Sequence, residues 1–589
     1  MWWNVLVVST VGRMHIDHAG RQYTTVDGER RAYPCHLLRR SFRDEQGRPR
    51  KETLANLSAL PSEAIDVLRK ALKGKTLVDA DAVFETERSV PHGDVAAAHV
   101  MASRLGLRTL LGPAGRERDI AYALIVSRVV APKSKLSTAR WWRTGDTTLG
   151  ADLGVADAST DEVYAAMDWL VDQQKNIEAR LAKRHLRAGG IAMFDLSSSW
   201  VEGRQCELAA FGYSRDGKRG RKQIEYGLLT CPAGRPVAIE VFAGNTSDAL
   251  SFTTAVARVR DNFGIERIIL VGDRGMITTT RIKELRQWEG MDWITALKAP
   301  AIAALASDDG PLQPSLFDTR NFAEITHPDY PGERLICCRN PALADERARK
   351  RQALLAATDK DLAKIAASVR AGRLTGAEKI GERIGKVIGK HKVAKHFLRE
   401  VTDTTFTYRR DEDKINAEAA LDGIYVIRTS VTDDTLNSTQ TVTAYKNLKH
   451  VERDFHIIKA DDLDLRPLHH YLGKRVRAHV LICMLAAYLT WHLREALAEL
   501  TFTDQHIPDR DDPVAPAQRS PQATTKDATK HTPDGLPLHR YKDLLHHLST
   551  LDRQIINFNG QRIEKITTPT PLQRRAFELL DAPVPVTLQ

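Results

Sequence analysis

The chain has 589 residues, of which 42% are hydrophobic and 27% are charged, so it exceeds a single core and its composition is that of a globular protein. Its 86 Lys and Arg against 75 Asp and Glu leave a net charge of +11, which suits a polyanionic partner because each cation that neutralises a phosphate releases a counterion. Six cysteines without CxxC pairs or matching histidines argue against a zinc site and against a disulfide framework.

Two apolar segments raise the question of a membrane. The opening MWWNVLVVSTVG is too short to span a bilayer and has no basic start or small-residue cleavage site. The longest later apolar stretch, residues 478–491, is interrupted by His479 and runs into charged residues. We therefore expect a cytoplasmic protein with no membrane partner.

The N-terminal region predicts one hairpin followed by helices. In residues 32–57 the stretches AYPCHLLRRSFR and RKETLANL flank the turn DEQGR, which is typical of a β-hairpin. A short helix follows in SALPSEAIDVLRKALKGK, with Pro61 or Ser62 near its start. Apolar residues then recur at helical spacing from Gly93 to about Ala188. We expect a hairpin and helix region over 1–92 and a helical region over 93–188.

At Gly189 the pattern changes to strands. IAMFDLSSSW predicts a buried strand, QIEYGLLTCPAGRPVAIEVF predicts two strands joined by a turn, and ERIILVGDRGM and MDWITAL predict two more, with helices between the later strands. Antiparallel strands followed by strand and helix alternation indicate an α/β fold, a mixed sheet with helices on its faces. The first part of this core is expected over residues 189–300.

The remaining chain predicts an insertion, a return to the core and a tail. Residues 301–421 mix loops, a charged helix and the basic stretch KIGERIGKVIGKHKVAKHF, which favours an insertion. Over 422–501 the strand DGIYVIRTS and a long helix from about Ser438 to Lys459 resume the core. Residues 502–537 are polar and rich in Pro and Thr, which predicts a mobile linker to a small C-terminal element within 502–589.

Three acids stand at informative positions. Asp195 is expected to end the first core strand and Asp273 the fourth, and open α/β sheets place their sites at the carboxyl ends of strands. Glu452 lies on the long helix, which has an apolar stripe and a second stripe that includes Glu452. The apolar stripe is Leu448, Val451, Phe455 and Ile458, and the second stripe is Tyr445, Lys449, Glu452, His456 and Lys459.

Such acids suit phosphodiester chemistry. Two Mg²⁺ ions about 3.5–4 Å apart, held by carboxylates, activate the nucleophile and stabilise the leaving oxygen. A strand-end Asp is more often a loop cap, and a lone helical Glu is usually solvated, so spacing alone leaves incidental acids as an alternative.

The run YKNLKHVERDFHIIK resembles the signature around the third acid of DDE transposases of the IS-four type, which is Tyr, two residues, Arg, three residues, Glu, six residues, Lys. Tyr445, Glu452 and Lys459 match this signature, whereas its Arg position holds Leu448, so the adjacent Lys449 is expected to supply the charge. FDLSSSWVEG and VGDRGM resemble the strands that carry the first and second acids of the family.

The resemblance implies an RNase H-like core interrupted by an insertion between the second and third acids, which are 179 residues apart here. It implies a homodimer that binds the terminal inverted repeats of an insertion sequence in double-stranded DNA and moves the element to target DNA by Mg-dependent strand cleavage and strand transfer. Asp195, Asp273 and Glu452 would be catalytic and would bind two Mg²⁺, with Mn²⁺ as a substitute. The protein would be associated with the nucleoid when bound to DNA.

Other residues are candidates for DNA contact. Tyr445, Lys449, Lys459 and Arg274 are expected to position DNA. In hairpin-forming relatives an aromatic residue stacks on a flipped base, and Tyr425 is that candidate here, with core packing as the alternative. Further basic candidates, each weighed against a solvated surface, are the stretch 379–395 and Arg219, Arg221 and Lys222.

Some features favour a structural role, and two other functions remain open. His469 and His470 have no partner at ligand spacing, which favours a structural role. The alternatives to an active transposase are a catalytically inactive, transposase-derived DNA-binding protein and a scaffolding protein whose acids are incidental.

Overall fold

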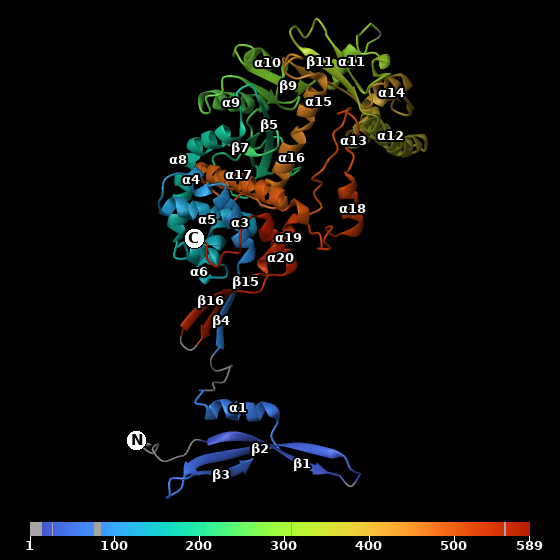
Figure 1. Ribbon diagram of the computed structural model, residues 1–589. Helices are drawn as coiled ribbons and strands as arrows, with labels where there is room; N and C mark the ends of the chain where they lie inside the picture. The colour runs from blue at the N-terminus through green and yellow to red at the C-terminus, as the bar shows by residue number, and fades with distance from the viewer. Residues whose placement is uncertain are drawn as a thin grey trace. The chain divides into compact units, whose positions relative to one another are not determined.

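The computed structural model describes residues 14–25, 27–75, 84–203, 205–307, 309–558 and 561–588 (Figure 1). The opening apolar segment, residues 1–12, lies outside the described residues. The chain divides into two compact units, Met1–Ser89 with Gln554–Lys565 and Val90–Arg553 with Ile566–Gln589. Each unit is described here by itself.

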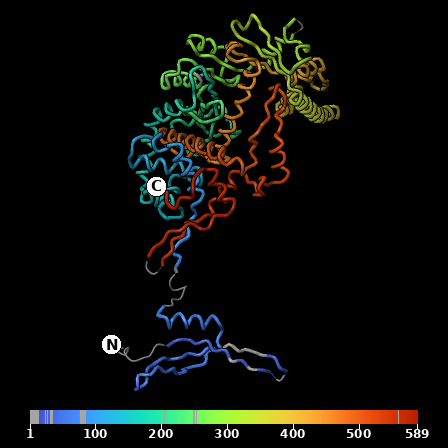
Figure 2. The backbone as a smooth tube through the Cα atoms, in the orientation of Figure 1, coloured from blue at the N-terminus to red at the C-terminus, as the bar shows by residue number. Residues whose placement is uncertain are grey.

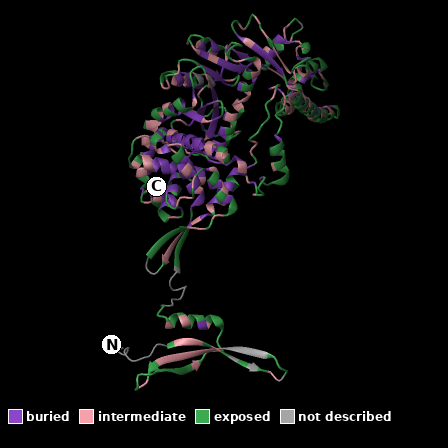
Figure 3. Ribbon diagram, viewed as in Figure 1, coloured by how far each residue is buried: buried purple, intermediate pink, exposed green. Residues whose placement is uncertain are grey.

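The N-terminal part of the smaller unit contains the predicted hairpin and one further strand that pairs with it. β2 (Arg30–Arg43) and β3 (Pro49–Asn56) pair antiparallel, as the hairpin pattern predicts. β1 (Met14–Thr24) pairs with β2 on its other side, and it was not predicted because MHIDHAGRQYT lacks a regular apolar alternation. The predicted helix is confirmed as α1 (Ser62–Leu72), with Ile65 buried. Most of this unit is exposed or half-buried (Figure 3).

The helices predicted for the second region are confirmed. They are α3 (Gly93–Arg104), α4 (Leu107–Leu111), α5 (Arg116–Val130), α6 (Lys135–Thr144), α7 (Leu149–Asp152) and α8 (Thr160–His185). A capping box of Ser159 and Glu162 begins α8 and satisfies backbone N–H groups that the first turn leaves without a partner. Their shared core includes α17 (Gly473–Ala496), which packs against α5, α8 and β7.

α17 is the described helix that is long and apolar enough to cross a membrane by length and composition. In this structure 83% of its most apolar window is buried inside the protein, and Figure 3 draws it buried along most of its length. Its apolar residues are therefore explained by burial in the core. His479, which interrupts the stretch, is itself buried.

The larger unit is built on an eight-stranded sheet, with the order β10-β11-β14-β9-β8-β5-β6-β7. β5 pairs parallel with β8 and β8 pairs parallel with β9, whereas the other neighbours run antiparallel. Helices flank the sheet, so the predicted mixed α/β architecture is confirmed. The strands are β5 (Ile191–Trp200), β6 (Gln223–Thr230), β7 (Pro236–Ala243), β8 (Ile268–Val271), β9 (Met291–Ala296), β10 (Phe322–Ile325), β11 (Arg334–Arg339) and β14 (Ile424–Thr429). The helices that follow its strands include α9 (Asp248–Asp261), α10 (Thr279–Leu285) and α11 (Ala299–Leu305).

Strands β10 and β11 fall within the span expected to be an insertion. They join the main sheet through β14, because β11 pairs with β14 along Arg334–Arg339. Their shortness and the unbroken apolar run of β11 hide them from a period-two pattern. The rest of the span has a separate core that includes Leu355, Leu362, Ile380 and Ile384. Its elements are α12 (Pro341–Arg370), α13 (Ala377–His391), β12 (Phe397–Val401), β13 (Phe406–Arg410) and α14 (Glu412–Ala419).

The prediction of a single long helix from about Ser438 to Lys459 is wrong in one respect, because the helix is interrupted at Asn447. α15 (Ser438–Lys446) ends at Asn447, α16 (Leu448–His456) begins there, and a π-helical turn over Ile457–Asp461 follows. The backbone N–H of Asn447 donates to both Thr443 and Ala444, which tightens the last turn of α15. The predicted apolar stripe is confirmed, with Val451, Phe455 and Ile458 buried.

The prediction of a mobile linker over 502–537 is also wrong. The segment runs beside α15 (Figure 2) and includes α18 (Pro521–Thr529). Val514 is fully buried, and the Lys446 ammonium donates to the carbonyls of Pro513 at 2.6 Å and Val514 at 3.0 Å. Polar composition concealed this docking because the contacts use backbone carbonyls, which every sequence has.

The expected C-terminal element is divided between the two units, with its helices in the main core and residues 554–565 in the smaller unit. α19 (Tyr541–Ser549) packs against α3, and α20 (Pro571–Leu579) contributes Leu572 and Phe577 to the same core. The N–H groups of His92 and Gly93 both donate to the carbonyl of Leu551. Between these helices, β15 (Asp552–Phe558) and β16 (Gln561–Ile566) form a three-stranded sheet with β4 (Phe84–Pro91).

Candidate active site

The register between β5 and β8 brings two of the three acids together. Met193 and Val271 form the last residue pair of the parallel ladder, and Asp195 and Asp273 each stand two residues further along their chains. Residues two apart on a strand point to the same face. The two carboxylates therefore occupy the place where β8 ends beside β5.

The expectation that Asp195 ends its strand is wrong. β5 continues to Trp200 because β6 pairs with it along its length, with Asp195 opposite Leu228. Only the parallel pairing with β8 ends near Asp195. Polar residues in SSSW suggested a strand end, but Ser197, Ser198 and Ser199 are buried within the sheet.

The pKa of Asp195 depends on the charges of both other acids. Burial and, to a smaller extent, the negative charges of Asp273 and Glu452 raise the pKa of its carboxyl group to about 7. The N–H of Leu196 donates to Asp195 Oδ1 at 2.8 Å and opposes these effects. Because charge interactions weaken with distance, Asp273 and Glu452 both lie within electrostatic range of Asp195.

Asp273 and Glu452 belong to two different elements, the turn after β8 and the helix α16. Asp273 is exposed, and its Oδ1 accepts the N–H groups of Gly275 and Met276, both at 2.9 Å. Glu452 is exposed on α16, whose orientation is set by buried Val451 and Phe455 on the other face. The turn after β8 and the helix α16 thus present carboxylates to Asp195.

Tyr445 lies among the acids. Burial and, to a smaller extent, the negative charges of Asp273, Glu452 and Asp195 raise the pKa of its phenol to about 12, and the charge of Arg274 opposes this shift. Tyr445 therefore lies within electrostatic range of the three acids and of Arg274. Arg274 itself is exposed and also lines a cavity of about 680 Å³ that reaches towards α12 and α14.

Lys459 is placed differently from the expectation of direct DNA contact. It is buried, and its ammonium lies 2.8 Å from Asp216 Oδ1, which also accepts a hydrogen bond from Arg466 at 2.6 Å. Burial lowers the pKa of Lys459, and Asp216 opposes that shift. Lys459 anchors the turn that contains Asp216 to the end of α16. Asp216 was not predicted because it lies 243 positions from Lys459 in the sequence.

The same turn brings a further cation to the acids. The positive charge of Arg215 lowers the pKa of Asp195, and the Arg215 guanidinium lies 3.4 Å from the buried carboxylate of Glu225. The cluster Arg219, Arg221 and Lys222 follows on the exposed approach to β6, where Arg221 pairs with Glu202 at 3.0 Å. Only the charge density of this turn, DGKRGRKQ, signalled a role in the sequence.

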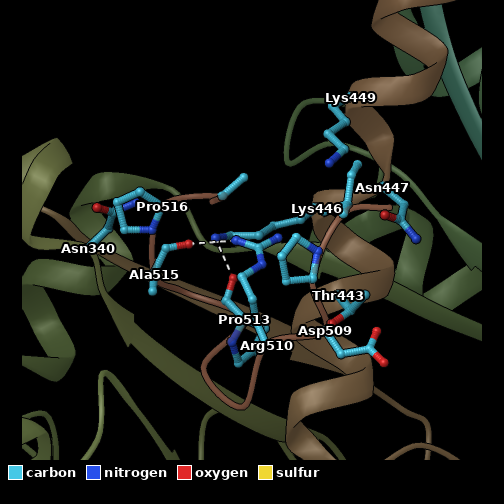
Figure 4. A pocket seen from close by; sticks show the side chains of 13 residues that line it. Asn340, Thr443, Lys446, Asn447, Lys449, Asp509, Arg510, Pro513, Ala515 and Pro516 are labelled. Carbon is cyan, nitrogen blue, oxygen red and sulfur yellow. Dashed lines mark hydrogen bonds between the residues drawn. The ribbon is translucent and has the colours of Figure 1, made fainter. Parts of the chain in front are cut away.

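Lys449 is exposed and borders a cavity of about 650 Å³ between α15, α16 and the docked segment (Figure 4). Lys446 and Arg510 line the same cavity, but both donate to backbone carbonyls of the segment. Leu448, at the Arg position of the signature, is half-buried against the main core. The adjacent Lys449 is thus the residue with an accessible charge, as expected.

Tyr425 and the basic stretch fit their structural alternatives better. Tyr425 faces Cys338 across β11 and β14 and packs, half-buried, against the main core. On α13, Ile380 and Ile384 are buried, while Lys386 pairs with Glu382 at 2.8 Å and Lys390 with Asp361 at 3.2 Å. These contacts favour packing for Tyr425 and a solvated amphipathic face for α13.

The donor set suits hard divalent cations. Within the described ranges no three His, Cys, Asp or Glu side chains are grouped closely enough to hold one ion together. Mg²⁺ needs only one or two carboxylates because water and phosphate oxygens complete its coordination. The negative charges of Asp273 and Glu452 raise the pKa of Asp195, and carboxylates coupled in this way are donors that suit a cation.

Comparison with known proteins defines the class to which this fold and site belong. Residues 197–489 match the family model described as the transposase DDE domain, a span that includes Asp273 and Glu452 and begins two residues after Asp195. The chain is therefore a DDE transposase. A solved structure described as the synaptic complex of piggyBac transposase with hairpin DNA aligns with a TM-score of 0.31 and 9% identity, over 78% of this chain and 76% of that chain. No curated protein sequence matches the chain.

Proposed function

We propose that this transposase binds the terminal inverted repeats of an insertion sequence, cleaves DNA strands at the element ends and joins them to target DNA, acting as a homodimer. The observation that carries the proposal is that the negative charges of Asp273 and Glu452, inside the matched DDE domain, both raise the pKa of Asp195, two residues before that domain. We assign strands β7-β6-β5-β8-β9, with two antiparallel and two parallel pairings, to an RNase H-like core.

Asp195, Asp273 and Glu452 would hold two divalent metal ions, Mg²⁺ or Mn²⁺. Bound there, such ions lower the pKa of an attacking water or 3′-hydroxyl and stabilise the leaving oxygen. The protein residues hold these carboxylates in place. β5 fixes Asp195, the Gly275 and Met276 N–H groups fix Asp273, and the buried face of α16 fixes Glu452.

Tyr445, Arg274 and Lys449 would position the scissile strand. The raised pKa of Tyr445 keeps its phenol protonated at neutral pH, so its hydroxyl can donate to a phosphate oxygen. Arg274 directly follows Asp273 and Lys449 lies three residues before Glu452, and both are exposed cations that would neutralise neighbouring phosphates. Lys459 would act indirectly, since it holds Asp216.

The test is cleavage of a labelled duplex that carries the inverted repeat of the element. Wild type is compared with Asp195→Asn, Asp273→Asn and Glu452→Gln, each with Mg²⁺ and with EDTA, and Asp434→Asn serves as a control because Asp434 is exposed and lies outside the site. We expect Mg-dependent cutting at the element end that the three site variants abolish while they still bind DNA. Binding without cutting by wild type would instead identify an inactive DNA-binding derivative, and absence of binding would favour a scaffolding role.

A further inference from the structure

A basic cavity lies away from the catalytic acids, between α5, α6 and the turn that precedes α17. Its volume is about 430 Å³. Its walls include Arg128, Lys133, Lys135, Arg466, His470 and His479, whereas Asp464 is the acid among the residues that line it. The charge inside this cavity is therefore mainly positive.

Lys135 is the first of two buried basic residues that line this cavity. It is the first residue of α6 and is 5% exposed. Its ammonium lies 3.1 Å from His479 Nδ1. Since an ammonium group only donates, His479 Nδ1 must accept and carries no proton. No carboxylate in the described parts of the chain lies within ion-pair distance of Lys135.

Arg128 adds a second buried cation. It is also 5% exposed, and its guanidinium donates to the carbonyls of Lys133 at 2.8 Å and Leu463 at 3.4 Å. No ion pair of Arg128 occurs among the described residues. Its charge acts on Lys135 and lowers the pKa of that lysine, in addition to the effect of burial. Buried charges are normally paired, because an unpaired charge loses its hydration without compensation.

The end of a helix reinforces the positive potential. Ser134 caps α6 and, with Lys135, lines the cavity, so the N-terminus of this ten-residue helix borders it. The N-terminal end of a helix carries a partial positive charge and attracts anions. The neighbouring histidines do not supply negative charge. Burial and the cations lower the pKa of His470 to about 4, so it is neutral at physiological pH.

We propose that this cavity binds a phosphate group of the DNA on which the transposase acts, held by Lys135, Arg128 and the N-terminus of α6. This inference rests on the proposed function. A phosphate oxyanion supplies the negative charge and the hydrogen-bond acceptor atoms that these two cations need as partners. His470, for which the sequence favoured a purely structural role, becomes part of the wall of a binding site.

One chain of ion pairs within the protein favours the DNA backbone as the source of the phosphate. Arg466 lines the cavity and also pairs with Asp216, which pairs with Lys459 at the end of the Glu452 helix. The cavity wall and the catalytic helix are thus joined through three buried or half-buried ionic groups. A DNA segment that reaches both would be held in a defined position relative to the acids.

The first experiment measures the salt dependence of binding to the duplex with the inverted repeat. Lys135→Gln should lower the affinity roughly tenfold and reduce the slope of log affinity against log salt by about one phosphate contact. Lys135→Arg should preserve the slope because it keeps the charge. Lys175→Gln, which removes an exposed lysine from α8, is the matched control and should behave as wild type. An unchanged slope in a folded Lys135→Gln protein would overturn the proposal.

A second experiment identifies the source of the phosphate. Thermal unfolding is followed in orthophosphate and in chloride of equal ionic strength, with wild type and Lys135→Gln. The site is supported if orthophosphate stabilises wild type but not Lys135→Gln and also competes with DNA. It is supported as well if orthophosphate has no effect but the salt dependence of DNA binding changes in Lys135→Gln. Stabilisation by orthophosphate without any Lys135-dependent DNA binding would overturn the assignment to DNA.

These outcomes are separable from those that test catalysis. A wild-type protein that binds DNA through Lys135 but never cuts it would overturn the proposed cleavage and leave the phosphate site intact. Normal cleavage with equal salt slopes for wild type and Lys135→Gln would overturn the phosphate site alone.

Discussion

The ammonium group of Lys459 lies 2.8 Å from Asp216 Oδ1, in a pair whose side chains are 10% and 2% exposed. The lysine of the transposase signature thus has a buried partner in a turn far away in the sequence. Arg466 shares the same oxygen and stacks over Trp200, with its guanidinium 5.1 Å from the ring centre. One carboxylate therefore neutralises two cations.

We expect Asp216→Asn to lower the free energy of unfolding by about 3 kcal/mol, because it leaves two cations in a protein interior without their counterion. Denaturant unfolding measures this change. Asp172→Asn is the control, since Asp172 and Lys474 pair at 2.8 Å but are 62% and 45% exposed, and its cost should stay below about 1 kcal/mol. Equal effects of the two substitutions would contradict the importance of burial.

Divalent metal should stabilise the folded protein through the three acids. A ligand that binds only the native state raises its stability by mass action, so Mg²⁺ or Mn²⁺ should raise the melting temperature of wild type by a few degrees. Asp195→Asn should abolish that rise without destabilising the metal-free protein, since it removes a desolvated charge that Asp273 and Glu452 repel. The site assignment fails if Asp195→Asn responds to metal as wild type does, and Asp434→Asn is the control.

Tyr445 and Tyr425 offer a matched pair of substitutions. Tyr445→Phe keeps the ring but removes the hydroxyl beside the acids, and we expect roughly a hundredfold slower cleavage with little change in DNA affinity. Tyr425→Phe should leave both quantities unchanged because that ring packs against the core beside Cys338. Single-turnover cleavage measures the rates. A larger effect at Tyr425 than at Tyr445 would restore the stacking role for Tyr425.

Stability should depend on pH through Asp94. Burial raises the pKa of this carboxyl group from 3.8 to about 6, although the N–H of Val95 donates to it and the charges of His546 and Lys133 oppose the shift. A raised pKa favours the protonated folded state, so this contribution is complete below the unfolded value and is lost as the pH rises through about 6.

Replacing Asp94 by Asn removes the titration. The stability of Asp94→Asn relative to wild type should therefore increase by about 2 kcal/mol between about pH 4 and about pH 8. Denaturant unfolding of both proteins at the two pH values measures this difference. Parallel pH profiles for variant and wild type would show that Asp94 is not responsible.

Lys446→Met should release the segment 502–537 from α15. The substitution removes the ammonium that donates to Pro513 and Val514, leaving buried carbonyl groups without a partner. Limited proteolysis should then cut the segment faster than in wild type. Lys449→Met removes an exposed lysine three residues further along the chain and should not alter the cleavage pattern.

Local sequence patterns predicted the sheet and the acids well, but they predicted the long-range contacts poorly. Strands β5 to β9 were visible because their apolar runs and turns are continuous in sequence, and Asp273 stands out directly after β8. The position of Asp195 within β5 was misjudged because buried serines resemble a strand end. β10 and β11 were missed because four to six residues without alternation carry no periodic signal.

The groups that complete the site depend on tertiary structure. Asp216 meets Lys459 only after the chain has brought together residues 243 positions apart, and no spacing rule encodes that distance. Val514 is buried because α15 supplies a lysine for the adjacent carbonyls, although its own neighbours are Pro and Ala. Sequence periodicity reports which face of an element is buried but does not report its partner.

Helices from the C-terminal part of the chain complete the hydrophobic core of the N-terminal helices. α5 and α8 pack on α17, α3 packs on α19, and Leu551 receives the N–H groups at the start of α3. During synthesis these early helices must wait for several hundred residues before they can bury their apolar faces. A product truncated before α17 would lack a folded core as well as a continuous site, so premature termination should yield a substrate for proteases and no partly active nuclease.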